Sequence, residues 1–148
     1  MNPKLSEQFF VRDNEEKDFG VLIDLTYRCA LECPRCQRQE FFRDHGEKVW
    51  GEDIPLDTIE KATDTFKAIN FGGQLSDPIH HPNFIEILKL CYEKGVQANV
   101  QTASTGKPKS WFIKAFEANP NARWQFGIDG LPEESHKYRV NQDGQKLF

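Results

Sequence analysis

Apolar and polar residues alternate along four short segments of the chain, which span residues 21–26, 68–73, 96–102 and 123–129. In the first segment Val21, Ile23 and Leu25 alternate with Leu22, Asp24 and Thr26. The other three segments repeat this spacing, with polar or small residues at the alternate positions. Because successive side chains of a strand point to opposite faces of a sheet, the pattern predicts four strands, each with one apolar face and one polar or small face.

Segments with helical spacing lie between these strands. The first opens at Asp57 with a capping-box-like D-x-x-E, the second follows Asn83 as its N-cap and ends at Gly95, and the third spans residues 110–118. The predicted apolar stripes are Ile59, Ala62, Phe66 and Ile69 in the first helix and Phe84, Leu88, Cys91 and Tyr92 in the second. Strands separated by helices of this length favour right-handed βαβ units and a parallel sheet.

The two-faced strands also indicate where a ligand binds. Parallel strands that are buried on both faces usually have continuous apolar runs, and these strands do not. An antiparallel sheet with one face in water would give the same alternation, but the intervening helices disfavour hairpins. We therefore expect the polar faces to line a shared cavity, with the ligand at the carboxyl ends of the strands.

Cys29, Cys33 and Cys36 follow the first predicted strand in the spacing C-x3-C-x2-C. Three thiolates on one loop can hold a [4Fe–4S] cube and leave one iron open, whereas most such cubes are held by four cysteines. Zinc is an alternative, but its structural sites need four ligands, and His45 is the nearest further candidate. Unrelated thiols are the other alternative. The fourth cysteine, Cys91, is predicted to be a packed apolar residue rather than a ligand.

The composition of the chain argues against nucleic-acid-binding, membrane-spanning and secreted proteins. The chain of 148 residues carries 19 basic and 23 acidic residues, and it has no block of basic residues that would suggest nucleic-acid binding. No apolar run approaches the roughly 20 residues needed to span a bilayer, and the first ten residues lack the apolar core of a signal peptide. Cysteines in such a chain indicate metal or catalytic thiols in a reducing compartment, so we expect a cytoplasmic protein.

The C-x3-C-x2-C triplet resembles the signature of the radical SAM (S-adenosylmethionine) enzymes. The resemblance implies that Cys29, Cys33 and Cys36 ligate a [4Fe–4S] cluster whose open iron binds the methionine part of SAM. One electron from the cluster then cleaves SAM to give a 5′-deoxyadenosyl radical, which abstracts hydrogen from a substrate. The family often has an aromatic residue just before the last cysteine, and this chain has Arg35 there.

Two further segments are similar to SAM-binding segments of that family. Gly72, Gly73 and Gln74 resemble its Gly-Gly-Glu-Pro stretch, which receives the SAM amino group. Gln74 stands where the family has Glu, and Asp77, directly before Pro78, could supply the missing carboxylate. Gln101 and Thr102, at the end of the third predicted strand, resemble the segment that reaches the SAM carboxylate or ribose.

The fourth predicted strand resembles the Ser-x-Asp-Gly pattern of the family. Asp129 keeps the acidic position, and Gly127 replaces the serine that often contacts the ribose. His136, Tyr138 and Arg139 follow as they do in members that modify peptides and proteins. The resemblance thus favours a peptide or protein substrate, with a small metabolite or a modified nucleoside as alternatives.

The resemblance covers residues 19–140 and implies an α/β fold, a parallel (βα)n partial TIM-like barrel. The family core has about six βα units, and four strands are predicted here, so we expect residues 1–148 to form the N-terminal portion of a radical SAM core domain, with a leader at 1–18 and the cluster loop at 29–36. A minimal version closed by a partner or by oligomerisation is the alternative, because an open last strand is an exposed edge.

Partners and competing functions follow from the same residues. A radical SAM enzyme would need an external electron donor of the flavodoxin or ferredoxin type. A non-catalytic iron–sulfur electron carrier and a zinc-stabilised binding module remain as alternatives from another functional class. Both alternatives need a fourth protein ligand, which the family's site-differentiated cluster does not.

Overall fold

The computed structural model describes residues 19–73 and 75–147, and its centre is a parallel sheet of four strands in the order β1-β2-β3-β4. The strands are β1 (Gly20–Ile23), β2 (Ala68–Phe71), β3 (Gln97–Thr102) and β4 (Arg123–Phe126). Each strand pairs with the next one along the chain, with Leu22 opposite Asn70 and Asn70 opposite Asn99. The predicted α/β class and parallel sheet are confirmed, and the arrangement is that of a partial (βα)n barrel.

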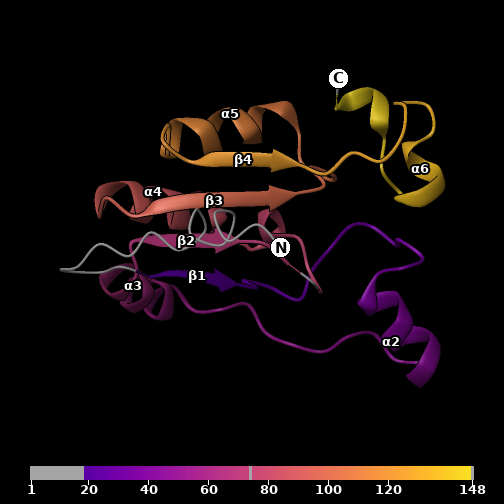
Figure 1. Ribbon diagram of the computed structural model, residues 1–148, viewed down its shortest axis with the longest axis horizontal. Coiled ribbons are helices and arrows are strands. Elements are labelled where there is room, and N and C mark those ends of the chain that lie inside the picture. Colours follow the sequence, from indigo (N-terminus) through magenta and orange to yellow (C-terminus); the bar gives the residue numbers. More distant parts are fainter. Residues whose placement is uncertain (1–18, 74, 148) are drawn as a thin grey trace, which may run out of the picture.

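Three helices follow the strands in alternation and pack on the apolar face of the sheet (Figure 1). They are α3 (Leu56–Thr65), α4 (Phe84–Glu93) and α5 (Lys109–Ala118). The main core joins Ile69, Phe71 and Val100 of the strands to helix residues such as Ile59 and Leu88. The predicted alternation therefore places the apolar side chains of the central strands in this core.

The opposite face of the sheet is polar at its centre. Asn99 Nδ2 donates to Asn70 Oδ1 at 2.9 Å, and Asn70 Nδ2 donates to the Val21 carbonyl oxygen at 3.4 Å. Gln101 and Gln125 continue this face in register on β3 and β4, and both are exposed. The Asn70 and Asn99 amides bond to each other across the strands, so they are partly satisfied without a helix covering them.

Some predicted strand ends are wrong. β1 ends at Ile23 rather than Thr26, and β4 ends at Phe126 rather than Asp129. Leu25 and Thr26 are still buried, but the Leu25 carbonyl accepts from the Ile54 amide at 2.9 Å instead of from a neighbouring strand. Long-range bonds of this kind end the ladder at positions that the alternation alone does not mark.

The predicted first residues and apolar faces of helices α3 and α4 are also partly wrong. The N-cap of α3 is Pro55, so Asp57 lies inside the first turn, and Ile69 belongs to β2 rather than to the helix. Asn83 occupies the N-cap of α4 without a side-chain capping bond. Tyr92 is 47% exposed and lies outside the apolar stripe of α4, where Ile87 is buried instead.

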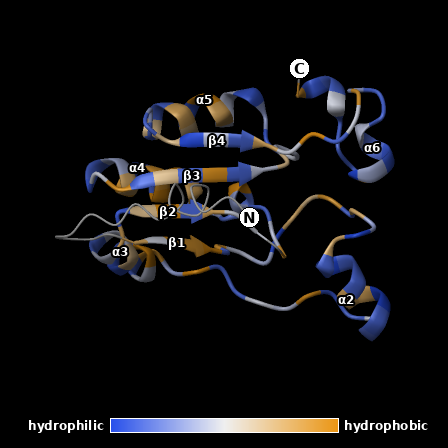
Figure 2. Cartoon of the chain, in the orientation of Figure 1, coloured by the Kyte–Doolittle hydropathy of each residue, from blue (hydrophilic) through white to orange (hydrophobic). Residues whose placement is uncertain are grey.

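The sequence pattern did not predict four further elements. They are α2 (Gln37–His45), α6 (Ser135–Tyr138) and two short 3-10 helices, η1 (Pro78–His80) and η2 (Gly144–Lys146). Helix α2 buries no residue, and Figure 2 shows it largely in hydrophilic colours. A helix without a buried face has no apolar periodicity by which it could be recognised. Among the helices described here, none is long and apolar enough to cross a membrane.

Phe84 is the centre of an aromatic cluster that joins α4 to the sheet and to α5. Its ring meets Phe71 edge-on at 5.7 Å and Trp124 edge-on at 6.3 Å, and it stacks with Trp111 at 6.2 Å. Phe84 is 1% exposed. Removing the ring would leave a cavity between three layers of aromatic side chains, and neighbours that are already packed can fill it only partly.

We therefore predict that Phe84→Ala lowers the free energy of unfolding by about 3–5 kcal/mol, measured by denaturant titration followed by circular dichroism. The matched control is Phe42→Ala in α2, because Phe42 is 46% exposed and the same ring is removed from a solvated position. If both variants lose equal stability, the core does not depend on Phe84.

Candidate functional site

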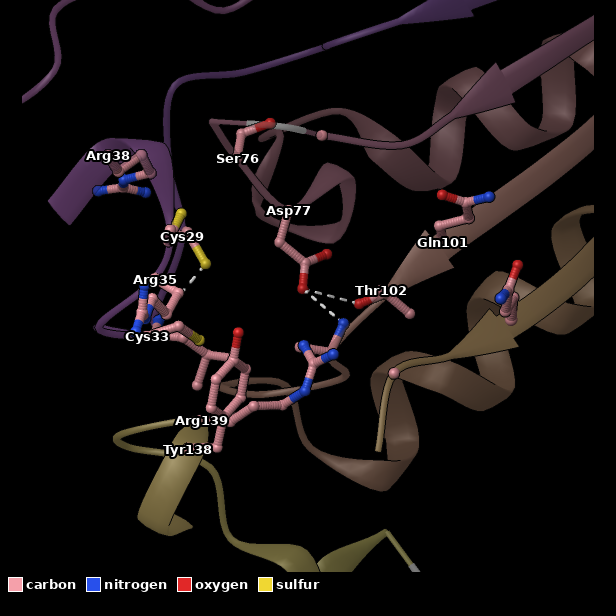
Figure 3. Close-up of a pocket in the computed structure, with 16 residues that line it drawn as sticks. Cys29, Cys33, Arg35, Arg38, Ser76, Asp77, Gln101, Thr102, Tyr138 and Arg139 are labelled. Carbon is pink, nitrogen blue, oxygen red and sulfur yellow. Dashed lines mark hydrogen bonds between the residues drawn. The ribbon is translucent and has the colours of Figure 1, made fainter. Parts of the chain in front are cut away.

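A pocket of about 380 Å³ lies at the carboxyl ends of the strands (Figure 3). Among the residues predicted from the sequence, the following line it: Cys29, Cys33, Cys36, Gly73, Asp77, Gln101 and Thr102. Figure 3 shows Cys29, Cys33, Arg35 and Arg38 on one side and Asp77, Thr102 and Gln101 on the other. Gly72 and Asp129 are not among the lining residues, and the predicted Gln74 lies outside the described residues.

The loop between β1 and α2 carries the three cysteines, and each of them is half-buried. A turn between Cys33 and Cys36, closed by a 3.0 Å bond from the Cys36 amide to the Cys33 carbonyl oxygen, brings these residues together. The Leu31 amide donates to Cys29 Sγ at 3.4 Å, and the Glu32 amide donates to the Val140 carbonyl oxygen at 3.1 Å. The loop is thus tied both to itself and to the C-terminal segment.

Burial shifts the pKa of Cys29 and of Cys33 in the cysteine loop. It raises the pKa of Cys29, against which the Leu31 amide and the positive charge of Arg38 act. Burial also raises the pKa of Cys33, and the nearby Arg139 opposes the shift. Since a thiol must lose its proton to bind a metal, a metal group at this site would displace these protons and form thiolates.

The three thiols of the cysteine loop fit some metal groups better than others. Within residues 19–73 and 75–147, no three His, Cys, Asp or Glu side chains lie close enough together to surround a single metal ion. The three thiols instead line the wall of one pocket, together with Arg38, whose Nη1 is shielded from solvent and has no hydrogen-bond partner. Soft sulfur donors spread around a cavity that also presents positive charge fit an anionic iron–sulfur cluster better than one zinc ion.

Asp77 connects three parts of the site. Its carboxylate accepts hydrogen bonds from Thr102 Oγ1 and the Ala103 amide, both at 2.9 Å, and a longer one from the Ile79 amide at 3.4 Å. Its own amide donates to the Arg28 carbonyl oxygen at 2.9 Å, next to Cys29. Burial raises the pKa of the Asp77 carboxyl, and the bonds from Thr102 and Ala103 counteract the shift.

The two predicted glycines permit close approaches of the backbone. A Cβ on Gly72 would lie 2.9 Å from Oε1 of Gln101, and one on Gly73 would lie 2.2 Å from the Ser76 carbonyl oxygen. A side chain at Gly73 would therefore collide with the backbone of its own turn. Asp24, directly after β1, accepts from Ser76 Oγ and from the Leu75 amide and so fixes this turn. The sequence analysis gave no role to Asp24.

The C-terminal segment closes the pocket on a third side. Tyr138 and Arg139 line it, and Arg139 Nε forms an ion pair with Asp129. The amide of Gln142, which is buried, donates to the carbonyl oxygens of Ala103 at 2.9 Å and Gly127 at 3.1 Å, so it connects the ends of β3 and β4. Sequence reasoning missed Gln142, since a single glutamine beyond the last strand carries no recognisable signal.

Comparison with known proteins supports the fold. No protein-family model matches the chain. Among solved structures, the chain is similar to SuiB of Streptococcus suis bound to the precursor peptide SuiA, with a TM-score of 0.65 and 12% sequence identity. The similar region covers 86% of this chain and 28% of that chain. At this identity the likeness shows the fold alone, which is the parallel α/β arrangement described above.

The bonds of Asp77 lead to a prediction about stability. Asp77→Ala would leave the buried Thr102 hydroxyl and the Ala103 amide without an acceptor, and each unsatisfied group costs about 1–3 kcal/mol. We expect a loss of unfolding free energy of that order or larger in denaturant titration. Asp57→Ala is the control, because that carboxylate is exposed and makes only an i,i+4 ion pair with Lys61. Equal effects of the two substitutions would contradict the connecting role of Asp77.

Proposed function

We propose that this chain is a radical SAM enzyme, or the N-terminal part of one, that binds a [4Fe–4S] cluster through Cys29, Cys33 and Cys36. The observation that carries the proposal is the position of these thiols, which line one pocket at the carboxyl edge of a parallel sheet. When bound, the cluster would supply the electron that cleaves SAM to methionine and a 5′-deoxyadenosyl radical for hydrogen abstraction.

The protein would contribute binding, orientation and exclusion of water. The turn at Gly72 and Gly73 lets the backbone approach a ligand closely, and the SAM amino group would bind there together with Asp77 or Gln74. The Asp77 carboxylate retains acceptor capacity at Oδ1, whose protein contact is the long one to the Ile79 amide. Gln101 and Thr102 would bind the SAM carboxylate or ribose.

Asp129 would act on SAM through its neighbours. Its ion pair with Arg139 directs the guanidinium over Gly127, where a Cβ would lie 2.8 Å from Arg139 Nη2. Arg139 lines the pocket, whereas Asp129 does not. We therefore assign to Asp129 the task of holding Arg139 at the edge of the cofactor site.

We propose a peptide or protein as the substrate. SuiB, whose fold this chain shares over 86% of its length, is bound to a precursor peptide. The amides of Asn70, Asn99, Gln101 and Gln125 on the polar face of the sheet suit an uncharged chain that both donates and accepts hydrogen bonds. A small metabolite or a modified nucleoside is the alternative. An external flavodoxin or ferredoxin would deliver the electron, and a partner or second copy would cover the open edge of β4.

The competing functions, an electron carrier or a zinc-stabilised module, need a fourth protein ligand, and His45 and Cys91 are the further imidazole and thiol that the sequence analysis considers. His45 is exposed at the end of α2, where its ring stacks on Phe41 at 4.3 Å and contacts the Phe41 carbonyl oxygen. Cys91 is buried in the main core, and burial raises the pKa of its thiol to about 12. Neither side chain lines the pocket.

The first test of the proposal is metal content. Anaerobic reconstitution with iron and sulfide should give about four irons and four sulfides per chain, measured by metal and sulfide analysis. Substituting Ala for any one of the three loop cysteines should abolish assembly, whereas Cys91→Ala should retain it. Stoichiometric zinc without iron after anaerobic purification would contradict the cluster and favour the zinc module.

The second test is cleavage of SAM. The reduced, cluster-loaded chain incubated with SAM should form 5′-deoxyadenosine and methionine, detected by liquid chromatography, even without the substrate. The carrier and the zinc module both predict no product. Asp77→Asn keeps a side chain of the same shape, so loss of SAM binding with an intact cluster would assign the amino group to the Asp77 charge. Loss in Gln74→Ala alone would assign it to Gln74 instead.

A further inference from the structure

Arg38 lies where the cysteine loop enters helix α2. The helix begins at Gln37, directly after Cys36, so Arg38 is in its first turn and its side chain reaches back to the pocket that the three thiols line. Figure 3 shows Arg38 on the same side of the pocket as Cys29. Its positive charge acts on Cys29 and also on His80 on the far side of the loop.

The guanidinium of Arg38 lacks an acceptor at one of its donors. Nη1 is shielded from solvent, and no hydrogen-bond partner for it is found in the described part of the chain. A buried donor that belongs to a charged group costs more free energy when it is left unpaired than a neutral donor does. An unpaired buried donor in a native protein often has a ligand as its acceptor. Because the guanidinium of Arg38 is positively charged, the ligand that suits it is an anion.

The carboxylates of Asp77 and Asp129 already have donors. The carboxylate of Asp77 accepts from Thr102 and Ala103 on the opposite wall. Asp129 is paired with Arg139. Once the cysteines of the loop are thiolates, they add negative charge to the wall of the pocket, and Figure 3 shows Arg38 on the same side of the pocket as Cys29 and Cys33.

We propose that Arg38 is a positioning residue that completes the iron–sulfur site: its guanidinium, whose Nη1 is shielded from solvent, donates to the sulfur-rich, negatively charged group held by Cys29, Cys33 and Cys36 and raises the reduction potential of that group. This inference rests on the proposed function. A [4Fe–4S] core with three thiolates is negative in both oxidation states and gains a further negative charge on reduction, so a fixed buried positive charge stabilises the reduced state more.

Arg35 provides the matched contrast. It lines the same pocket and carries the same charge, but it is exposed between Cys33 and Cys36, where water solvates and screens it. Arg38 and Arg35 thus differ in burial rather than in formal charge. A role that depends on a desolvated donor should be specific to Arg38, whereas a general effect of pocket charge should appear at both positions.

The experiment is an anaerobic redox titration of the reconstituted full chain, followed by the electron paramagnetic resonance signal of the reduced cluster. Arg38→Gln should lower the equilibrium constant for reduction at least tenfold, which corresponds to about 59 mV for a one-electron couple. Arg38→Lys should lower it less, because lysine keeps the charge but lacks the planar fork of donors. Arg35→Gln should shift it less than Arg38→Gln does.

Three results would overturn the proposal. Equal shifts in Arg35→Gln and Arg38→Gln would show a general charge effect. An unchanged potential with weaker binding of SAM, measured by equilibrium dialysis, would show that Arg38 serves the carboxylate of SAM instead. Failure of both Arg38 variants, but not of Arg35→Gln, to hold iron would show a role in assembly.

If the unsubstituted chain assembles no cluster, the proposed function itself fails and this inference with it.

Discussion

The arrangement of the whole site depends on the buried carboxylate of Asp77. It receives the hydroxyl of Thr102 and the amide of Ala103 from the end of β3, while its own amide holds the Arg28 carbonyl oxygen. A buried carboxylate is tolerated only when donors surround it, so the loop after β2 must meet the end of β3 at this point. The loop before Cys29 is fixed by the same residue, and the thiols face the pocket as a consequence.

The sheet could be predicted from the sequence because the alternation that marks each strand lies within a few consecutive residues. Alternation in the segments around Ile69 and Val100 marks strands with one buried face, and the helices between them require parallel pairing. The ends of the strands could not be predicted in the same way. They depend on partners far along the chain, such as the Ile54 amide at the Leu25 carbonyl oxygen.

The same distinction applies to the site. The cysteine triplet and the glycine pair are recognisable because each occupies a few consecutive residues, and the structure brings Gly73 and the thiols to one pocket. Asp24, which fixes the turn before Asp77, and Gln142, which connects β3 to β4, act on residues 15 to 52 positions away. Neither residue belongs to a local pattern, so only the folded chain reveals them.

The departures from the pattern of the family that the sequence resembles are coupled to their neighbours in space. Gly127 stands where serine is usual, and Arg139 fills the volume that a side chain there would need, since a Cβ would lie 2.8 Å from its Nη2. A serine at this position would displace the guanidinium and weaken its ion pair with Asp129. With glycine at position 127, the guanidinium of Arg139 occupies the place of a serine hydroxyl and reaches the same pocket. A substitution that removes a polar group from the motif thus leaves the polarity of this edge intact, because a residue twelve positions later supplies it.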